Sequence, residues 1–178
     1  QEQTGRIDHV VVSIGLASET LGYPFWNLAP EQWNRMLEVN LIGPVSVAHA
    51  FVPHMLTRKC GTMCFVSSIA GQIGSQTDPP YSAAKAGLIN FMQCAAKDMA
   101  PYGIRANAMA PGSLADAEQM SKEAYQQRQE TAKGQIPLGR TGHLKEVGYL
   151  SVFLASPAAA YVTGQTWAVD GGISIKHP

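Results

Sequence analysis

Four short apolar runs alternate along the chain with longer stretches in which apolar residues recur every three or four positions. The runs are HVVVSIG at 9–15, TMCFVSS at 62–68, IRANAMAPG at 104–112 and TWAVDGG at 166–172. Each run ends at Gly or Ser, as β-strands do where the chain turns. Strands that alternate with helices pair in parallel through right-handed crossovers. The alternation therefore predicts an α/β fold in three layers, with helices on both faces of one parallel sheet.

Three of the intervening stretches have the periodicity of helices. Residues 30–58 place apolar side chains at spacings of three and four, as a core-facing helix requires. Residues 79–102 begin after Asp78, a capping residue type, with two prolines that suit a first helical turn, and they end at Gly103. Residues 144–155 form a shorter helical stretch. These stretches supply the helical layers of the predicted fold.

The segment 113–134 interrupts this alternation because it is polar. Its sequence SKEAYQQRQETAK lacks a strong apolar stripe, which indicates a partly exposed helix and loop. One interpretation is a lid over a substrate site at the carboxyl ends of the strands. The other is a solvated connecting helix, and spacing alone does not separate the two.

Charge and cysteine content narrow the classes of partner. Thirteen Lys plus Arg balance thirteen Asp plus Glu without a long run of one sign, so nothing indicates nucleic-acid or membrane binding. The three cysteines show neither paired spacing nor a His cluster, which argues against disulfides and a metal site. No apolar run reaches the roughly 20 residues that span a bilayer, and the polar start does not resemble a signal peptide. We expect a cytoplasmic protein with a small-molecule partner.

The sharpest local feature is the pair of Tyr81 and Lys85 at the start of the second predicted helix. Residues four apart lie on one helix face, so the ammonium can sit close to the phenol. A free tyrosine has a pKa of about 10, and a nearby cation favours the phenolate. The spacing therefore permits a general acid/base with a lowered pKa. Alone, the pattern YxxxK is weak, because a tyrosine and a lysine often share a helix by chance.

The position of Ser68 gives this pair a context. Ser67 and Ser68 stand where the second apolar run ends, and the helix with Tyr81 follows within one crossover. In an open α/β sheet the carboxyl ends of the strands form the ligand crevice. A serine hydroxyl there can donate a hydrogen bond to a substrate oxygen as charge develops on it. Without Tyr81 nearby, a turn or a helix cap would be the better interpretation.

Five ordered segments resemble the short-chain dehydrogenase/reductase family. They are LEVNLIGP at 37–44, FVSSIAG at 65–71, YSAAKAGL at 81–88, IRANAMAPG at 104–112 and YVTGQTWAVDGG at 161–172. The separations of Ser68, Tyr81 and Lys85 are those of the family, and the match runs through nearly the whole chain. Within the family the chain is similar to the group of 3-oxoacyl-carrier-protein reductases, hydroxysteroid dehydrogenases and sugar or polyol dehydrogenases. The resemblance implies the C-terminal part of a Rossmann-type doubly wound sheet, with 1–178 as one partial domain.

The same resemblance implies an oxidoreductase that moves hydride between NAD or NADP and a ketone or secondary alcohol. Tyr81 would be the general acid/base, and Lys85 would lower its pKa and hold the nicotinamide ribose. Ser68 would orient the substrate oxygen, and Asn40 would keep a water in the proton relay. The residues implied in cofactor binding are Ser13, Gly15, Tyr81, Lys85, Pro111, Gly112 and Leu114.

The largest departure from the family is the lack of a glycine-rich G-x-G-x-x-G turn after a strand near the N-terminus. In the family that turn holds the pyrophosphate at a helix N-terminus. Gly71, Gly74 and Gly87 cannot replace it, because they lie around the segments of Ser68 and Tyr81. We therefore expect that the family's N-terminal half, two βαβ units, is absent here.

Two smaller departures concern the same cofactor. The family's Asn-Asn-Ala-Gly is here VSIG at 12–15, so that Val12 replaces an amide that contacts the cofactor. After the Pro-Gly at 111–112 the usual threonine is missing, and Asp116 stands at its place. We expect both changes to reduce cofactor affinity even where the catalytic residues are in position.

Two functions remain open on the sequence alone. The first is an NAD(P)-dependent oxidoreductase whose cofactor half is missing or supplied elsewhere, which the joint presence of Asn40, Ser68, Tyr81 and Lys85 favours. The second is a non-catalytic relative that serves as a structural or regulatory subunit, which the missing glycine-rich turn and Val12 favour.

Three further expectations follow from the resemblance and the apolar pattern. The run at 9–15 becomes an apolar edge strand that needs a cover. The helices over 30–58 and 79–102 carry more apolar surface than one sheet face covers, so they form the interface of a homodimer or homotetramer. The isolated 178-residue chain turns over poorly, because the pyrophosphate anchor is missing.

Overall fold

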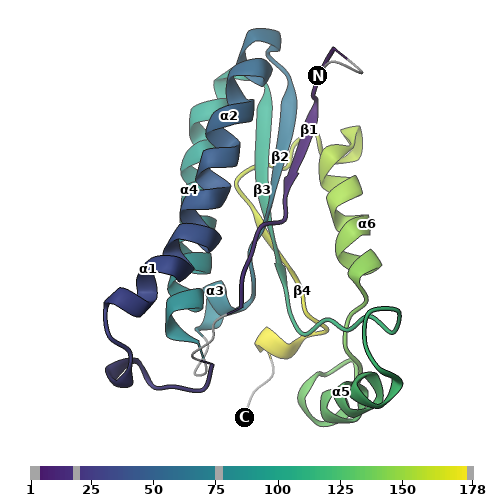
Figure 1. Cartoon of the computed structure of the whole chain (residues 1–178). Coiled ribbons are helices and arrows are strands. Elements are labelled where there is room, and N and C mark those ends of the chain that lie inside the picture. Colours follow the sequence, from purple (N-terminus) through teal and green to yellow (C-terminus); the bar gives the residue numbers. More distant parts are fainter. Residues whose placement is uncertain (1–4, 18–20, 75–77, 176–178) are drawn as a thin grey trace.

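The computed structural model describes residues 5–17, 21–74 and 78–175, which build one parallel sheet with helices on both faces (Figure 1). The strands lie side by side in chain order and are β1 (His9–Val12), β2 (Gly61–Val66), β3 (Ile104–Pro111) and β4 (Thr166–Val169). Every neighbouring pair is parallel, with Val12 opposite Phe65 and Phe65 opposite Ala108. The predicted three-layer α/β/α class is confirmed.

One face of the sheet is covered by two long helices that run side by side. They are α2 (Gly43–Arg58) and α4 (Pro79–Met99). The helix predicted over 30–58 consists of α1 (Glu31–Leu37), a π-helical turn (Glu38–Ile42) and α2. A single wide turn of this kind changes the apolar periodicity very little, which is why the sequence showed one continuous helix.

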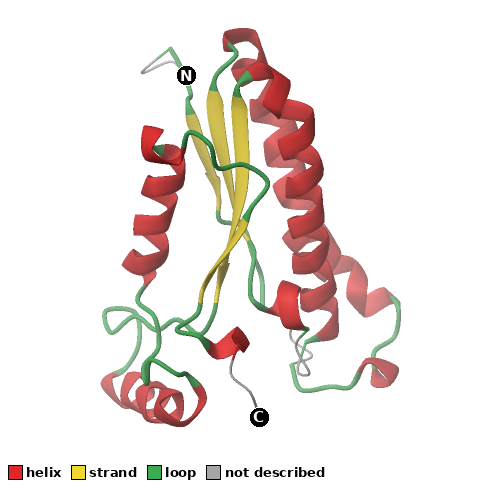
Figure 2. Ribbon diagram, turned by 180° about the vertical axis from the view of Figure 1, so that it is seen from behind, coloured by secondary structure: helices red, strands yellow, loops and turns green. Residues whose placement is uncertain are grey.

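Of the helices in the described residues, α6 (Leu144–Ala155) covers the opposite face, and its bounds are those predicted (Figure 2). Its first turn is closed by a capping box, in which His143 accepts from a backbone N–H and Glu146 accepts from the backbone N–H of His143. Two further helices, α3 (Ala70–Ile73) and α5 (Lys122–Gln135), lie toward the carboxyl ends of the strands. Short 3-10 turns occupy Phe25–Asn27, Ala100–Tyr102, Pro157–Ala159 and Ile173–Ile175.

The main core lies between the sheet and the layer of α2 and α4. Alternate residues of β1, β2 and β3 point to this layer, among them Val12, Met63 and Phe65, and they pack in one cluster with Leu88 and Met92 of α4. On the α6 side the buried cluster is much smaller and consists of Cys64, Met109 and Leu154. The two faces of the sheet are therefore covered unequally.

The apolar edge expected at the first strand is present. Among the described residues, β1 has a strand neighbour on one side only, and Val11 on the α6 side of the sheet is 48% exposed. A parallel strand is normally covered on both faces.

The apolar surface that we assigned to the predicted oligomer interface is distributed differently. Among the described residues of the predicted ranges 30–58 and 79–102, Ile42 and Tyr102 are large exposed apolar side chains, whereas α6 alone carries four. The large apolar side chains of α2 and α4 are buried or half-buried, and the interface through these two ranges stays a prediction.

One helical run, Glu31–Arg58, is long and apolar enough by composition to cross a membrane. A core helix of a soluble protein meets the same criterion, and in this run Pro44, Ala48 and Met55 are buried. The run therefore gives only weak support for a membrane span.

Candidate active site

The predicted catalytic residues come together at the carboxyl ends of the strands. Ser68 follows β2 by two residues, and Tyr81 and Lys85 occupy the first two turns of α4. Asp78 is the N-cap of α4, and its carboxylate accepts a hydrogen bond from the backbone N–H of Tyr81 at 3.4 Å. This contact caps the start of α4, and the bond from Lys85 Nζ to the carbonyl of Val66 links α4 to the end of β2.

The Ser68 hydroxyl lies close enough to the Tyr81 phenol to favour its ionised form, which acts to lower the pKa of Tyr81. The Ser68 Oγ also accepts from the backbone N–H of Ala70 at 3.1 Å, which orients the hydroxyl. The ammonium of Lys85 lies 5.5 Å from the centroid of the Tyr81 ring. Ser68, Tyr81 and Lys85 therefore converge on one place, as the sequence predicted.

Lys85 is almost completely buried, with 2% of its surface exposed. Its Nζ donates to two backbone carbonyls, of Val66 at 3.1 Å and of Ile14 at 3.4 Å. Burial lowers the pKa of this ammonium to about 8. Because an ammonium has three N–H groups, two backbone contacts leave one donor for a further oxygen.

The pKa of Tyr81 is raised, which is opposite to the lowering that we expected from Lys85. Burial of the phenol is the main cause, since it penalises the phenolate, while the Ser68 hydroxyl acts in the other direction. The negative charge of Asp78 adds to the rise. At neutral pH the phenol therefore keeps its proton and can act as a proton donor.

Asn40 is fully buried in the π-helical turn and binds the loop after β1. Its Oδ1 accepts from the N–H of Leu16 at 3.1 Å, and its Nδ2 donates to the carbonyls of Leu16 and Met36 at 3.1 and 3.2 Å. Both N–H groups of the amide are thus used by the backbone. Only the second lone pair of Oδ1 is left for the water that the resemblance implies.

A cavity of about 440 Å³ opens beside Tyr81. Of the described residues, those that line it are Gly15, Leu16, Ala17, Leu21, Ala70, Asp78 and Tyr81, all of which except Asp78 and Tyr81 are apolar or glycine. A Cβ at Gly15 would lie 3.3 Å from Asn40 Oδ1 and 3.5 Å from Lys85 Nζ. The missing side chain therefore keeps open the space next to both groups.

Two residues that the sequence reasoning did not assign to the site hold it together. Ser67 is buried, and its hydroxyl donates to the carbonyl of Lys85 at 2.9 Å. A Cβ at Gly71 would come within 2.7 Å of the Lys85 backbone, so only glycine allows α3 to approach α4 this closely. The pairs SS and AG were visible in the sequence, but their partners across space were not.

The other residues implied in cofactor binding lie at the same end of the sheet. Pro111 ends β3, and its carbonyl accepts from the N–H of Ile69, next to Ser68. The N–H of Gly112 donates a hydrogen bond to the carbonyl of Val169. Two residues later, Leu114 pairs with Gly142 in an isolated β-bridge. Ser13 directly follows β1 and is exposed.

Within the 113–134 segment the structure places the start of α5 and the loop that precedes it. Arg128 of α5 donates to the carbonyl of Leu114 at 3.1 Å, and Gln129 donates to the hydroxyl of Thr141 at 2.6 Å. Asp116 accepts from the N–H of Glu118 at 2.9 Å and so stabilises its own loop.

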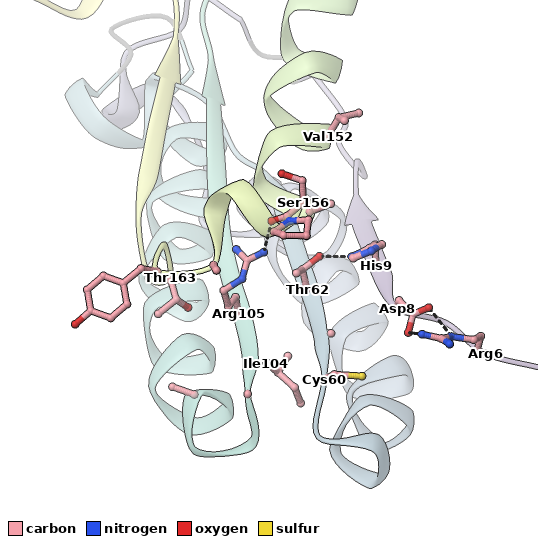
Figure 3. A pocket seen from close by; sticks show the side chains of 17 residues that line it. Arg6, Asp8, His9, Cys60, Thr62, Ile104, Arg105, Val152, Ser156 and Thr163 are labelled. Atoms are coloured by element: carbon pink, nitrogen blue, oxygen red, sulfur yellow. Dashed lines mark hydrogen bonds and ion pairs between the residues drawn. The ribbon is translucent and has the colours of Figure 1, made fainter.

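A larger groove, of about 1060 Å³, lies at the opposite ends of the strands (Figure 3). Its polar side chains bind one another or the backbone. Arg105 donates to the carbonyls of Leu154 and Val162 at 2.8 and 3.1 Å, and His9 and Thr62 are hydrogen-bonded at 2.8 Å. These contacts join α6 and the strands, which explains the polar residues of the groove without a ligand.

Comparison with known proteins places this geometry in a family. A family model described as enoyl-(acyl carrier protein) reductase matches residues 1–174. The 3-oxoacyl-[acyl-carrier-protein] reductase of Thermotoga maritima is 37% identical over 174 residues, which cover 98% of this chain and 69% of that protein. The acetoacetyl-CoA reductase of Synechocystis sp. is 36% identical over 171 residues, covering 96% and 69%.

A solved structure agrees with these relatives. The 3-oxoacyl-[acyl-carrier protein] reductase with bound NAD from Brucella melitensis superimposes with a TM-score of 0.83 at 31% identity, covering 98% of this chain and 65% of that one. The chain thus spans about two thirds of the length of the proteins that it matches. With a match along almost its whole length in sequence and in fold, the chain belongs to the short-chain dehydrogenase/reductase family of oxidoreductases.

Proposed function

We propose that the protein transfers hydride between NAD or NADP and a ketone or secondary alcohol, with Ser68, Tyr81 and Lys85 at the reacting atoms. The observations that carry the proposal are that Tyr81 lines a cavity at the carboxyl ends of the strands and that the Ser68 hydroxyl acts on its phenol. Two hydroxyls that meet in this way can both reach one substrate oxygen.

The residues at the carboxyl ends of the strands fit the nicotinamide and ribose of such a cofactor. Gly15 leaves open the space beside Asn40 and Lys85, and the third N–H of the Lys85 ammonium can bind a ribose hydroxyl. Pro111, Gly112, Leu114 and Ser13 lie at the same end of the sheet. The described residues do not supply a glycine-rich turn for the phosphates, so the fit concerns the nicotinamide and its ribose.

When bound, a reduced nicotinamide supplies the hydride that adds to the carbonyl carbon. The carbonyl oxygen then gains negative charge, and the Ser68 hydroxyl donates a hydrogen bond to it. Tyr81 transfers its proton to this oxygen, which completes the alcohol. The ammonium of Lys85 stabilises the phenolate that remains, and Asn40 holds the loop at Leu16 that lines the cavity.

We further propose that the segment 113–134 acts as a lid over the substrate. The contacts of Arg128 with Leu114 and of Gln129 with Thr141 support this, because they tie α5 to the loops around Leu114 without burying it in the core. A homodimer or homotetramer and a cytoplasmic location remain predictions.

Cofactor binding tests the proposal at Gly15. We expect that titration of the native protein with NADH or NADPH enhances cofactor fluorescence, and that the protein oxidises the bound cofactor when a small ketone is added. Gly15→Val fills the space beside Lys85 and should abolish binding. Gly148→Val is the matched control, since nothing lies within 4 Å of a Cβ at Gly148 in α6.

The proposal would be contradicted if the native protein bound neither NADH nor NADPH. It would also be contradicted if Gly15→Val bound the cofactor as tightly as the native protein does. Binding without turnover of any ketone or alcohol would favour the non-catalytic relative instead.

A further inference from the structure

We infer that Asp78 makes the cavity beside Tyr81 selective for substrates with a hydrogen-bond donor, such as a hydroxyl, next to the reacting carbonyl. The inference rests on the proposed function, because it names the class of substrate that the same cavity accepts.

Asp78 is an unusual wall residue for this cavity. The residue is 5% exposed, and it lines the same cavity as Tyr81. As the N-cap of α4 it accepts from the Tyr81 N–H at 3.4 Å, which is a long hydrogen bond. A carboxylate has about four acceptor positions, so this contact leaves acceptor capacity for a ligand.

Among the described residues of the wall, Leu16, Leu21 and Ala70 are apolar and offer this carboxylate no side-chain donor, and the Tyr81 hydroxyl is the proton donor of the proposed reaction. A buried acceptor in apolar surroundings gains most from a donor that a ligand brings with it. A ligand with a methyl group at that point would leave the carboxylate with the long contact to the Tyr81 N–H and no further donor.

The charge of Asp78 reaches the reacting group. Its negative charge is one of the causes of the raised pKa of Tyr81. Among the described residues, Lys85 on the same helix also places a charge near the Tyr81 ring. A substrate carboxylate next to the carbonyl would be repelled by Asp78, whereas a hydroxyl would bind to it.

The test compares hydroxyacetone with butan-2-one, in which a methyl group replaces the hydroxyl. NMR titration of the labelled native protein measures both dissociation constants and needs neither cofactor nor turnover. We expect hydroxyacetone to bind about tenfold more tightly or better, as for a hydrogen bond to a charged group.

Two variants separate the carboxylate from its role as a helix cap, because Asn and Ser also serve as N-caps. Asp78→Ser, whose hydroxyl is too short to reach far into the cavity, should bring the ratio of the two constants close to one. Asp78→Asn keeps an oxygen without the charge and should give an intermediate ratio. Asp98→Asn, at an exposed position near the other end of α4, should keep the ratio of the wild type.

The inference would be overturned if the wild type bound the two ketones with equal affinity or did not bind hydroxyacetone measurably. A preference for hydroxyacetone that survives in Asp78→Ser would overturn it as well. The failure of the proposed function looks different: the wild type would keep its preference for hydroxyacetone in binding but reduce neither ketone.

Discussion

The two helical layers of the sheet differ in how completely they cover it. The layer of α2 and α4 buries a cluster of twelve residues, including Phe65 and Met92, which are fully buried. The layer of α6 buries three and leaves Tyr149 and Val152 70% and 68% exposed. Tyr81 and Lys85 lie on the closely packed layer.

This difference shows where the fold can hold reacting groups in place. A side chain on α4 is positioned by a helix that the sheet, α2 and α3 all contact, so Ser68, Tyr81 and Lys85 keep one geometry. The outer side of α6 has no such support among the described residues, since Tyr149 and Val152 are exposed.

The largest expected effect on stability comes from the core under α4. Phe65 is fully buried and contacts Phe91 edge to face at a centroid distance of 5.8 Å. Phe65→Ala should lower the free energy of unfolding by about 3–5 kcal/mol in urea titration, because it leaves a cavity. Val152→Ala on α6 should change it by less than about 0.5 kcal/mol, as an exposed site does. Similar losses at both positions would show that the two layers are packed equally.

A second effect depends on pH and concerns the buried Lys85. Its pKa is about 8 in the folded chain and 10.5 for an ordinary lysine. Between these two pH values the unfolded chain therefore binds more protons than the folded chain. The free energy of unfolding therefore gains a contribution that rises as the pH goes from about 8 to about 9.5.

Lys85→Met removes this titration, and urea unfolding across that pH range measures the difference from the wild type. Lys145→Met, at an exposed lysine of α6, should leave the pH slope as it is. Parallel curves for the wild type and Lys85→Met would contradict the assigned burial of the ammonium.

A smaller loss of stability is expected when a serine hydroxyl that donates to a helix carbonyl is removed, and each layer offers one such serine. Ser67 donates to the carbonyl of Lys85, and Ser151 donates to the carbonyl of Gly148 at 2.7 Å. Ser67→Ala should cost about 1 kcal/mol and also lower kcat, because it loosens α4 at Lys85. Ser151→Ala should leave kcat unchanged. If both variants keep full kcat, Ser67 does not position Lys85.

The smallest effect is a shift of one phenol pKa. Asp78→Asn removes a negative charge near Tyr81, so the pKa of Tyr81 should fall. The ultraviolet absorbance of the phenolate follows the titration, and the spectrum of Tyr81→Phe isolates this residue from the other tyrosines. An unchanged or raised pKa would mean that the carboxylate does not act on the phenol.

Much of the fold was predictable because periodicity reports which element a segment forms. The four strands, α4 and α6 lie where the apolar pattern placed them, although β1 ends at Val12 and does not extend to Gly15. The π-helical turn around Asn40 was not visible, since one extra residue in a turn hardly alters the pattern.

The site was predictable in its residues but not in its environment. Motif order and spacing brought Ser68, Tyr81 and Lys85 together correctly. The raised pKa of Tyr81 could not be foreseen, because it depends on burial in the folded chain. The place of Asp78 in the cavity wall was hidden for the same reason, although the sequence identified it as a cap.

Comparison of two tyrosines tests the central claim most directly, which is that the chemistry lies on the α4 layer at Tyr81. Steady-state reduction of a ketone is measured for the native protein and for the variants Tyr81→Phe and Tyr149→Phe, and kcat is compared. Each variant removes one phenol hydroxyl and keeps the ring. Tyr81→Phe should lower kcat by about 10²- to 10⁴-fold, as the loss of a general acid does, while Tyr149→Phe should match the wild type. A Tyr81→Phe variant with the kcat of the wild type would contradict the account.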